Sequence, residues 1–282
     1  MQLKQALASA VDRLEAADVG SPRMNAEVLL MFVLGVNRAY LYAHPERELT
    51  AEEESRYNET LAQRATGMPS QYITGHQEFW GLDFIVSPAV LIPRPETEHL
   101  VETVLELARG IPNPKLVDVG TGSGCIALAL AHELKDAEVY GLDISCEALE
   151  IARANAARLQ LETRVHFAQS NVLEALSDVL DFDFVVSNPP YVGFGEADKV
   201  QRSVRNFEPR AAVFAGEQGL HVIGTLVEQA HTALKPGGWL AVEIGYSMRD
   251  AVLNLLDPTL WEYVNVVPDL QGIPRVVAAR KG

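Results

Sequence analysis

The sequence predicts an α/β fold in which a Rossmann-like, mostly parallel sheet of seven strands carries a small helical bundle at its N-terminal side. From residue 115 onward, short apolar runs alternate with helical segments, which is typical of right-handed βαβ units. Before residue 70, apolar residues recur at spacings of three and four, which is typical of amphipathic helices. We therefore expect two domains, 1–70 and 94–282, joined by a linker over 71–93.

The N-terminal stretch is expected to form helices that share one apolar face. In the first helix that face contains Leu3, Leu7, Ala10, Val11 and Leu14. Ser21 and Pro22 predict an N-cap and first turn for the second helix, and Thr50 predicts the start of the last one. This domain has no cluster of histidine or cysteine residues, so we expect it to orient a partner or cover a site rather than to catalyse.

Residues 71–93 change to an aromatic and β-branched composition, with Gly75 and Gly81 as turn points, and predict a β-hairpin. The strands of the following domain are expected at 115–120, 138–144, 165–169, 182–188, 239–245, 263–267 and 275–279. The last two are joined by residues 268–274 with no helix between them, so the last strand should run antiparallel to the others.

Composition excludes several classes of protein. The chain has 282 residues, of which 48% are hydrophobic and 22% charged, as in globular proteins. Its net charge of -15 argues against broad, nonspecific binding to nucleic acid. The N-terminus has neither a signal-peptide core nor a spanning segment, which predicts a cytoplasmic protein. The two cysteines and seven histidines show no metal-ligand spacing, so no metal site is expected.

A glycine-rich segment, Gly120-Thr121-Gly122-Ser123-Gly124, follows the first strand of the α/β domain and opens a helix. Alternate glycines let the backbone turn sharply and approach a ligand, while the helix N-terminus directs amide donors at it. A strict dinucleotide fingerprint would need glycine where Cys125 stands, so another adenosine ligand fits better. A plain turn between strand and helix remains the alternative.

Asp143 ends the next strand, where a carboxylate can accept hydrogen bonds from both hydroxyls of a ribose. Alternatively, the negative charge of Asp143 stabilises the positive N-terminal end of the helix that follows. Further along, a strand ends in Asn188-Pro189-Pro190-Tyr191. The Asn188 side-chain oxygen and the Pro189 carbonyl can accept both hydrogens of a planar NH₂ group, against which Tyr191 can pack. Two such hydrogen bonds would turn the lone pair of that nitrogen toward an electrophile, so these residues predict a site that positions an NH₂ group for reaction.

Together these motifs resemble class I S-adenosylmethionine-dependent methyltransferases that act on amino or amide nitrogen. The resemblance narrows to the bacterial PrmC (HemK) family and covers almost the whole chain. It is carried by the following segments in order: PSQYITG, LIPRPETEHLVE (91–102), DVGTGSGCIALALA, VVSNPPY, NFEPRAAVFAGEQGL (206–220) and VEIG. The family implies transfer of a methyl group from S-adenosyl-L-methionine to the glutamine amide nitrogen in the Gly-Gly-Gln loop of peptide chain release factors, without a membrane partner.

Carried onto this sequence, the family implies that residues 120–124 wrap the methionine part of the cofactor and that Asp143 holds the ribose. Asn171 and Val172 would lie at the adenine, where the family usually has an acidic residue and a larger side chain. An asparagine oxygen can still accept from the adenine amine. Asn188 would contact both the cofactor and the substrate amide, with Pro189, Pro190 and Tyr191 completing the substrate site.

Other interpretations stay open from the residues alone. Asn-Pro-Pro-Tyr would equally suit an amino methyltransferase acting on a base of DNA or RNA, although such enzymes need a basic channel. A non-catalytic adenosine-binding module and an NAD-dependent oxidoreductase fit less well. Glu96, Glu98 and Glu208 belong either to the mouth of the site or to solvated surfaces. Within 199–210, four basic residues stand against Glu208 alone, which suggests a surface that guides the substrate.

Overall fold

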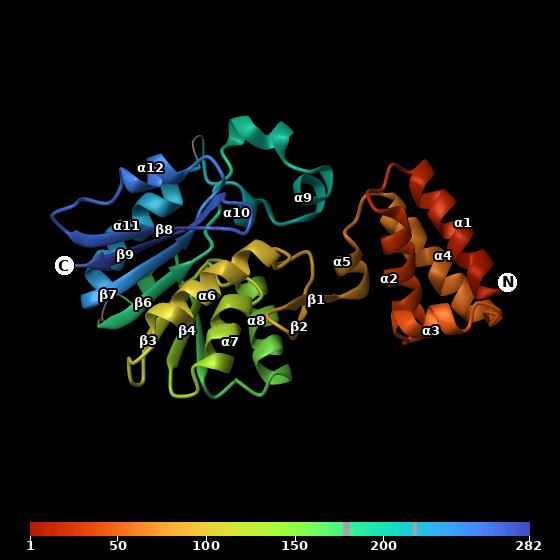
Figure 1. Ribbon diagram of the computed structural model, residues 1–282, viewed down its shortest axis with the longest axis horizontal. Helices are drawn as coiled ribbons and strands as arrows, with labels where there is room; N and C mark the ends of the chain where they lie inside the picture. Colours follow the sequence, from red (N-terminus) through yellow and green to blue (C-terminus); the bar gives the residue numbers. More distant parts are fainter. Residues whose placement is uncertain (177–180, 217–218) are drawn as a thin grey trace. The chain divides into compact units, whose positions relative to one another are not determined.

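The computed structural model describes residues 1–176, 181–216 and 219–282 (Figure 1). The described chain divides into two compact units. One comprises residues 1–76 together with 201–207, and the other comprises 77–200 and 208–282. The segment 201–207 thus belongs with the N-terminal helices although it follows the Asn-Pro-Pro-Tyr strand in the chain.

The first unit is a bundle whose helices bury apolar stripes against one another. Its helices are α1 (Leu3–Ala16), α2 (Pro22–Leu34), α3 (Arg38–Ala43), α4 (Ala51–Ala65), α5 (Ser70–Thr74) and α9 (Arg202–Phe207). Thr50 caps α4 as expected and forms a capping box with Glu53. Ser21 is the N-cap residue of α2 and Pro22 is its first residue, as expected, but Ser21 has a φ of 51° and its side chain makes no capping hydrogen bond.

The second unit begins with a hairpin of β1 (His76–Phe79) and β2 (Leu82–Ile85), which lies within the expected β-rich stretch. Residues 71–74 are helical instead of extended, because Ile73 packs on the core of the helical bundle. The aromatic rings of Phe79 and Phe84 are fully buried against the α/β core, which ties the hairpin to this unit.

The large sheet has the order β5-β4-β3-β6-β7-β9-β8. Its strands are β3 (Lys115–Val119), β4 (Glu138–Asp143), β5 (Val165–Gln169), β6 (Phe182–Ser187), β7 (Leu234–Glu243), β8 (Trp261–Pro268) and β9 (Pro274–Lys281). The first five pair in parallel and β9 runs antiparallel to both β7 and β8, so the expected antiparallel last strand is confirmed. The sheet therefore has the mostly parallel, seven-stranded arrangement that the sequence predicts.

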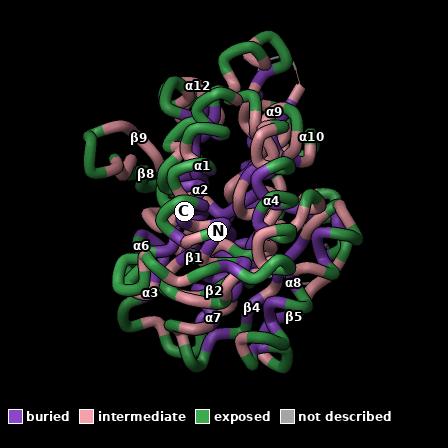
Figure 2. The backbone as a smooth tube through the Cα atoms, turned by 90° about the vertical axis from the view of Figure 1, so that its right-hand side faces the viewer, coloured by how far each residue is buried: buried purple, intermediate pink, exposed green. Residues whose placement is uncertain are grey.

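Helices cover both faces of this sheet. One face packs against α6 (Glu98–Leu107), α7 (Cys125–Glu133) and α8 (Cys146–Arg158), and the other against α11 (His221–Ala233) and α12 (Arg249–Leu253). Every residue of β6 is buried, although Asp183 and Ser187 are polar, as expected for a central strand that is covered on both faces. Figure 2 shows how buried and exposed segments are distributed along the backbone. Short helices η1 (Pro95–Thr97), η2 (Glu174–Leu176), η3 (Phe194–Lys199) and α10 (Arg210–Val213) form the connections.

In the part of the chain that the structure describes, none of the helices combines the length and hydrophobicity that crossing a bilayer requires. The same residues contain no group of three His, Cys, Asp or Glu side chains placed to bind a metal ion.

Candidate functional site

The glycine-rich loop leaves β3 at its carboxyl end and needs its glycines. Gly120, Gly122 and Gly124 have φ values of 73°, 55° and 82°, in the left-handed region that other residues adopt only with strain. The backbone amides at positions 120 and 121 both donate to the carbonyl of Leu142 at 2.8 Å. The loop is thereby tethered to the end of β4, the strand that carries Asp143.

Asp143 joins this loop to the next helix. Its Oδ2 accepts from the Gly122 amide at 2.8 Å and its Oδ1 from the Ser145 amide at 2.9 Å, while burial raises its pKa. Ser145 in turn caps α8 through the Ala148 amide. The helix-favouring role and the ligand role are therefore compatible, because each carboxylate oxygen keeps a second lone pair for a ribose hydroxyl.

Asp118, within β3, is a buried acid that sequence reasoning did not single out as a site residue. Its Oδ2 accepts from the Thr121 hydroxyl at 2.6 Å and from the Ala127 amide at 3.2 Å. These two bonds hold the glycine-rich loop and the first turn of α7 against β3. Burial raises its pKa to about 7. Its Oδ1 and the buried Ser123 hydroxyl have no hydrogen-bond partner among the described residues. A carboxylate inside an apolar strand was the signal that could have identified it.

The residues expected at the adenine follow β5. The Ser170 amide donates to the carbonyl of Asp143 at 2.9 Å, which holds this segment beside the end of β4. Val172 has a φ of 52°, a strained conformation for a β-branched residue. The Asn171 amide group donates to Glu174 Oε1 at 2.7 Å. That bond directs one end of the Asn171 side chain toward η2 and leaves its oxygen as an acceptor.

The Asn-Pro-Pro-Tyr motif directly follows β6. In the sheet register, Ser187 pairs with Val119 of β3 and with Val242 of β7, and its hydroxyl donates to the Val119 carbonyl at 2.6 Å. The motif therefore begins next to the glycine-rich loop, as the carboxyl ends of neighbouring parallel strands require. Asn188 is half-buried, and its Nδ2 donates to the Thr97 hydroxyl at 3.0 Å.

Thr97 connects Asn188 to a second buried acid. The Thr97 hydroxyl hydrogen-bonds the carboxylate of Glu243, and both residues are only 2% exposed. Burial raises the pKa of Glu243 to about 7. Its Oε2 has no hydrogen-bond partner among residues 1–176, 181–216 and 219–282. Sequence reasoning missed both residues, which lie within the PRPETE and VEIG segments but far from Asn188 in the chain.

Tyr191 is held by close backbone packing. A Cβ added at Gly219 would lie 2.1 Å from the carbonyl oxygen of Tyr191, and one at Gly245 would lie 3.2 Å from its ring. Val192 pairs in parallel with Phe214, so the segment 206–220 braces the motif. Positions 217 and 218 of that segment lie outside the described residues. Burial raises the pKa of Tyr191 to about 12, so its hydroxyl stays protonated at neutral pH.

The three glutamates whose role the sequence leaves open, Glu96, Glu98 and Glu208, have different surroundings. Glu208 is buried, forms an ion pair with Arg94 and accepts from the Ile92 amide at 3.3 Å, so it holds the segment before Thr97 in place. Glu98 accepts from the Trp80 amide at 2.9 Å and therefore anchors the hairpin. Glu96 is exposed and lies close enough to Glu243 to raise its pKa.

Comparison with known proteins agrees with this arrangement. A family described as the PrmC N-terminal domain matches residues 5–75, and one described as a methyltransferase domain matches 112–256. The release factor glutamine methyltransferase of Koribacter versatilis is 59% identical over 281 residues, covering 100% of this chain and 99% of the relative. The chain belongs to the release factor glutamine methyltransferase family. A member from Moorella thermoacetica is 44% identical and covers 99% of this chain and 98% of its own.

Solved structures show the fold of this methyltransferase. The hMettl16 catalytic domain in complex with an RNA hairpin aligns with a TM-score of 0.58 at 18% identity, covering 78% of this chain and 81% of that one. The T. Thermophilus 16S rRNA N2 G1207 methyltransferase, in complex with AdoMet and guanosine, aligns with a TM-score of 0.54 at 19% identity, covering 73% and 50%. At these identities the likeness concerns the fold alone.

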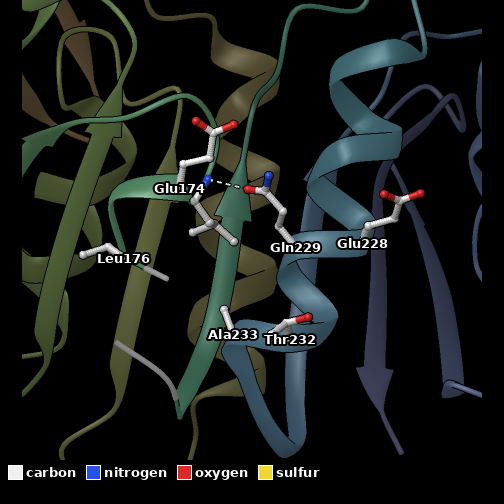
Figure 3. A pocket seen from close by; sticks show the side chains of 7 residues that line it. Glu174, Leu176, Glu228, Gln229, Thr232 and Ala233 are labelled. Carbon is white, nitrogen blue, oxygen red and sulfur yellow. Dashed lines mark hydrogen bonds between the residues drawn. The ribbon is translucent and has the colours of Figure 1, made fainter. Parts of the chain in front are cut away.

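The methyltransferase also has a cavity of about 400 Å³ away from the predicted residues. It lies between η2 and α11 (Figure 3) and is lined by Leu173, Glu174, Leu176, Glu228, Gln229, Thr232 and Ala233. Gln229 Oε1 accepts from the Leu173 amide at 2.8 Å at its edge. None of the predicted site residues lines this cavity. The candidate site is instead the carboxyl edge of β3, β4, β5 and β6, where the fold brings those residues together.

Proposed function

We propose that this enzyme transfers a methyl group from S-adenosyl-L-methionine to the side-chain amide nitrogen of the glutamine in the Gly-Gly-Gln motif of peptide chain release factors. The observation that carries the proposal is the Asn188 amide, whose nitrogen is engaged by Thr97, so that its oxygen remains for a substrate NH₂ group. Full-length identity of 59% to a release factor glutamine methyltransferase supports the same reaction.

The residues at the sheet edge suit the proposed methyl donor. Asp143 lies where a carboxylate can bind ribose hydroxyls, and the glycine-rich loop permits close approach of a ligand to its backbone. The unpartnered Asp118 Oδ1 and Ser123 hydroxyl add polar atoms beneath that loop, within the described part of the chain. Asn171 and Val172 would border the adenine. When bound, S-adenosyl-L-methionine supplies an electrophilic methyl group on a sulfonium.

The substrate site would act by orientation. The Asn188 oxygen and the Pro189 carbonyl would each accept one hydrogen of the glutamine amide, while Pro190 stiffens the turn and Tyr191 packs beside the planar group. An amide nitrogen is a poor nucleophile because its lone pair is delocalised. Two hydrogen bonds that fix the NH₂ group would turn its lone pair toward the methyl group that the cofactor supplies when bound. The proton that the nitrogen gives up on methylation would pass to water.

We further propose that residues 1–70 contact the protein substrate, that 71–93 link the domains, and that 94–282 carry out the transfer. A docking role for the bundle is supported by the match of residues 5–75 to the PrmC N-terminal domain, which a bare methyltransferase fold lacks. Since release factors act at the ribosome, we propose that the enzyme works in the cytoplasm.

The decisive experiment incubates the purified enzyme with radiolabelled S-adenosyl-L-methionine and a peptide chain release factor. A matched release factor, in which the glutamine of the Gly-Gly-Gln loop is replaced by alanine, is the control. We expect label in the first factor, located on the glutamine by mass spectrometry, and none in the second. Equal labelling of both factors, or of neither, would refute the proposed substrate.

The competing substrate is a base amine of DNA or RNA, since such an NH₂ group is also planar and would fit Asn188 equally well. The net charge of -15 disfavours it, because phosphate binding requires a basic surface. Adding single-stranded DNA and RNA as further arms of the same experiment tests this alternative directly. We expect no transfer to nucleic acid, and transfer there without transfer to the release factor would establish the alternative.

A further inference from the structure

Three side chains from separate parts of the sheet edge form one hydrogen-bonded chain. Asn188 follows β6, Thr97 ends η1 and Glu243 ends β7. The Thr97 hydroxyl lies between the other two, 3.0 Å from Asn188 Nδ2 and bonded to the Glu243 carboxylate. Thr97 and Glu243 are buried, so water does not replace either bond without cost.

The chemistry of the groups gives this chain a single direction. An amide nitrogen only donates hydrogen bonds, so the Thr97 oxygen accepts from Asn188. A threonine hydroxyl has one proton, and when Glu243 is ionised that proton is donated to its carboxylate. If the Asn188 amide were rotated by 180°, its oxygen would face the oxygen of the Thr97 hydroxyl. That hydroxyl has no proton left to donate, because it donates its proton to Glu243. The bonds at Thr97 and Glu243 therefore select one orientation of the Asn188 amide.

Thr97 is itself held in position. The segment before it is fixed by Glu208, whose carboxylate pairs with Arg94 and accepts from the Ile92 amide. The carboxylate of Glu243 is likewise fixed at the end of a central strand, where Val242 pairs with Ser187. Thr97 and Glu243 thus both lie on elements whose backbone is held by contacts other than those to the Asn188 side chain.

We propose that Thr97 and Glu243 are positioning residues for methyl transfer, which hold the Asn188 side chain with its oxygen toward the substrate amide. This inference rests on the proposed function, because the orientation matters only for a substrate that presents an NH₂ group. With the amide reversed, the NH₂ group of Asn188 would face the NH₂ group of the substrate, and neither group can accept a hydrogen bond. The bound amide would then lose one of the two acceptors that direct its lone pair.

The test compares Thr97→Val, which keeps the shape but removes the hydroxyl, with Thr97→Ser, which keeps the hydroxyl. We expect Thr97→Val to lower kcat for the release factor at least tenfold and Thr97→Ser to retain at least a third of it. Cofactor Kd should stay within twofold in both. Thr103→Val is the matched control, since the hydroxyl of this buried threonine on α6 donates to the His99 carbonyl of its own helix. Equal kcat in Thr97→Val and Thr97→Ser would overturn the inference.

A second pair tests the other end of the chain. Glu243→Gln retains an acceptor oxygen for Thr97 and should keep most activity, whereas Glu243→Met removes the acceptor at similar size and should lose it. Thermal unfolding of all variants separates these effects from loss of the fold. If Glu243→Met were as active as Glu243→Gln, the role of Glu243 would be refuted.

A readout on the free enzyme separates this inference from the proposed function. With asparagine labelled by ¹⁵N, the side-chain NH₂ signals of Asn188 are identified by their loss in Asn188→Asp. In Thr97→Val we expect the hydrogen-bonded proton of that group to shift upfield and exchange faster, with no substrate present. Unchanged signals would overturn the positioning role. Altered signals in an enzyme that fails to methylate the release factor would instead refute the proposed substrate.

Discussion

Asp143 and Gly122 are joined by a hydrogen bond of 2.8 Å from the glycine amide to the carboxylate Oδ2. A residue at the end of β4 therefore shapes the loop that follows β3, so the two predicted parts of the cofactor site form a single structural unit. Any change at Asp143 must affect both the ribose contact and the loop.

Asp143→Ala should raise the Kd for S-adenosyl-L-methionine at least tenfold, because both the ribose acceptors and the tether of the Gly122 amide are lost. Isothermal titration calorimetry measures the effect. Asp136→Ala, at an exposed aspartate between α7 and β4, is the control and should leave the Kd unchanged. Equal affinity in the two variants would contradict the role of Asp143.

Asn188→Ala should abolish transfer to the release factor while the enzyme still binds the cofactor measurably. The physical reason is that Asn188 supplies one of two acceptors for the substrate amide, whereas the glycine loop and Asp143 lie on neighbouring strands and remain intact. Single-turnover assays and calorimetry provide the two measurements. Full activity of this variant would remove Asn188 from the mechanism.

Gly219→Ala should destabilise the site, since its Cβ would lie 2.1 Å from the Tyr191 carbonyl oxygen and its φ is +71°. We expect activity to fall at least tenfold and the melting temperature to fall by several degrees. Gly224→Ala, on α11, meets nothing within 4 Å and should instead stabilise the helix by about 0.5 to 1 kcal/mol. Differential scanning calorimetry of the pair decides between steric conflict and a general effect of alanine.

Asp118 should make stability depend on pH. Burial raises its pKa from 3.8 to about 7, with Asp143 adding to the effect. Between these values the folded state binds the proton that the unfolded state has released. The stabilisation is thus complete below about pH 4 and is lost as the pH rises through about 7. Urea unfolding should show wild type losing roughly 2 to 4 kcal/mol relative to Asp118→Asn across that range. Parallel pH curves for the two proteins would contradict this pKa.

The basic stretch 199–210 should guide the substrate. In the structure, Lys199 forms an ion pair with Glu196, and Glu208 forms one with Arg94. The side chain of Arg202, by contrast, lies on the exposed surface of α9. Arg202→Glu should raise the KM for the release factor severalfold at low salt, with cofactor affinity unchanged. Arg109→Glu, at an equally exposed position, serves as control. An unchanged KM in Arg202→Glu would exclude this surface from docking.

Several features of the site were predictable because their causes are local. Glycine at positions 120, 122 and 124 follows from a backbone with positive φ, and the alternation of strand and helix places the residues after β3, β4 and β6 at one sheet edge. The antiparallel last strand likewise followed from a connection without a helix.

Other contacts were not predictable, because they join residues distant in sequence. Thr97 and Asn188 are 91 positions apart, and Arg94 and Glu208 are 114 apart. No spacing rule relates such pairs, and the short helix that carries Thr97 has no periodic pattern. The positive φ angles of Val172 and Ser21 likewise do not follow from the preference of either residue type.

By itself the sequence determined the fold class, and it predicted the sheet edge and the chemistry of the residues of the candidate site. Backbone preference, hydrophobic period and strand order are properties of short segments, so they can be inferred from the chain alone. Only the tertiary structure decided which oxygen of which side chain is free to act. Hydrogen-bond direction depends on the complete set of partners around a buried group, and for Asn188 those partners come from η1 and β7.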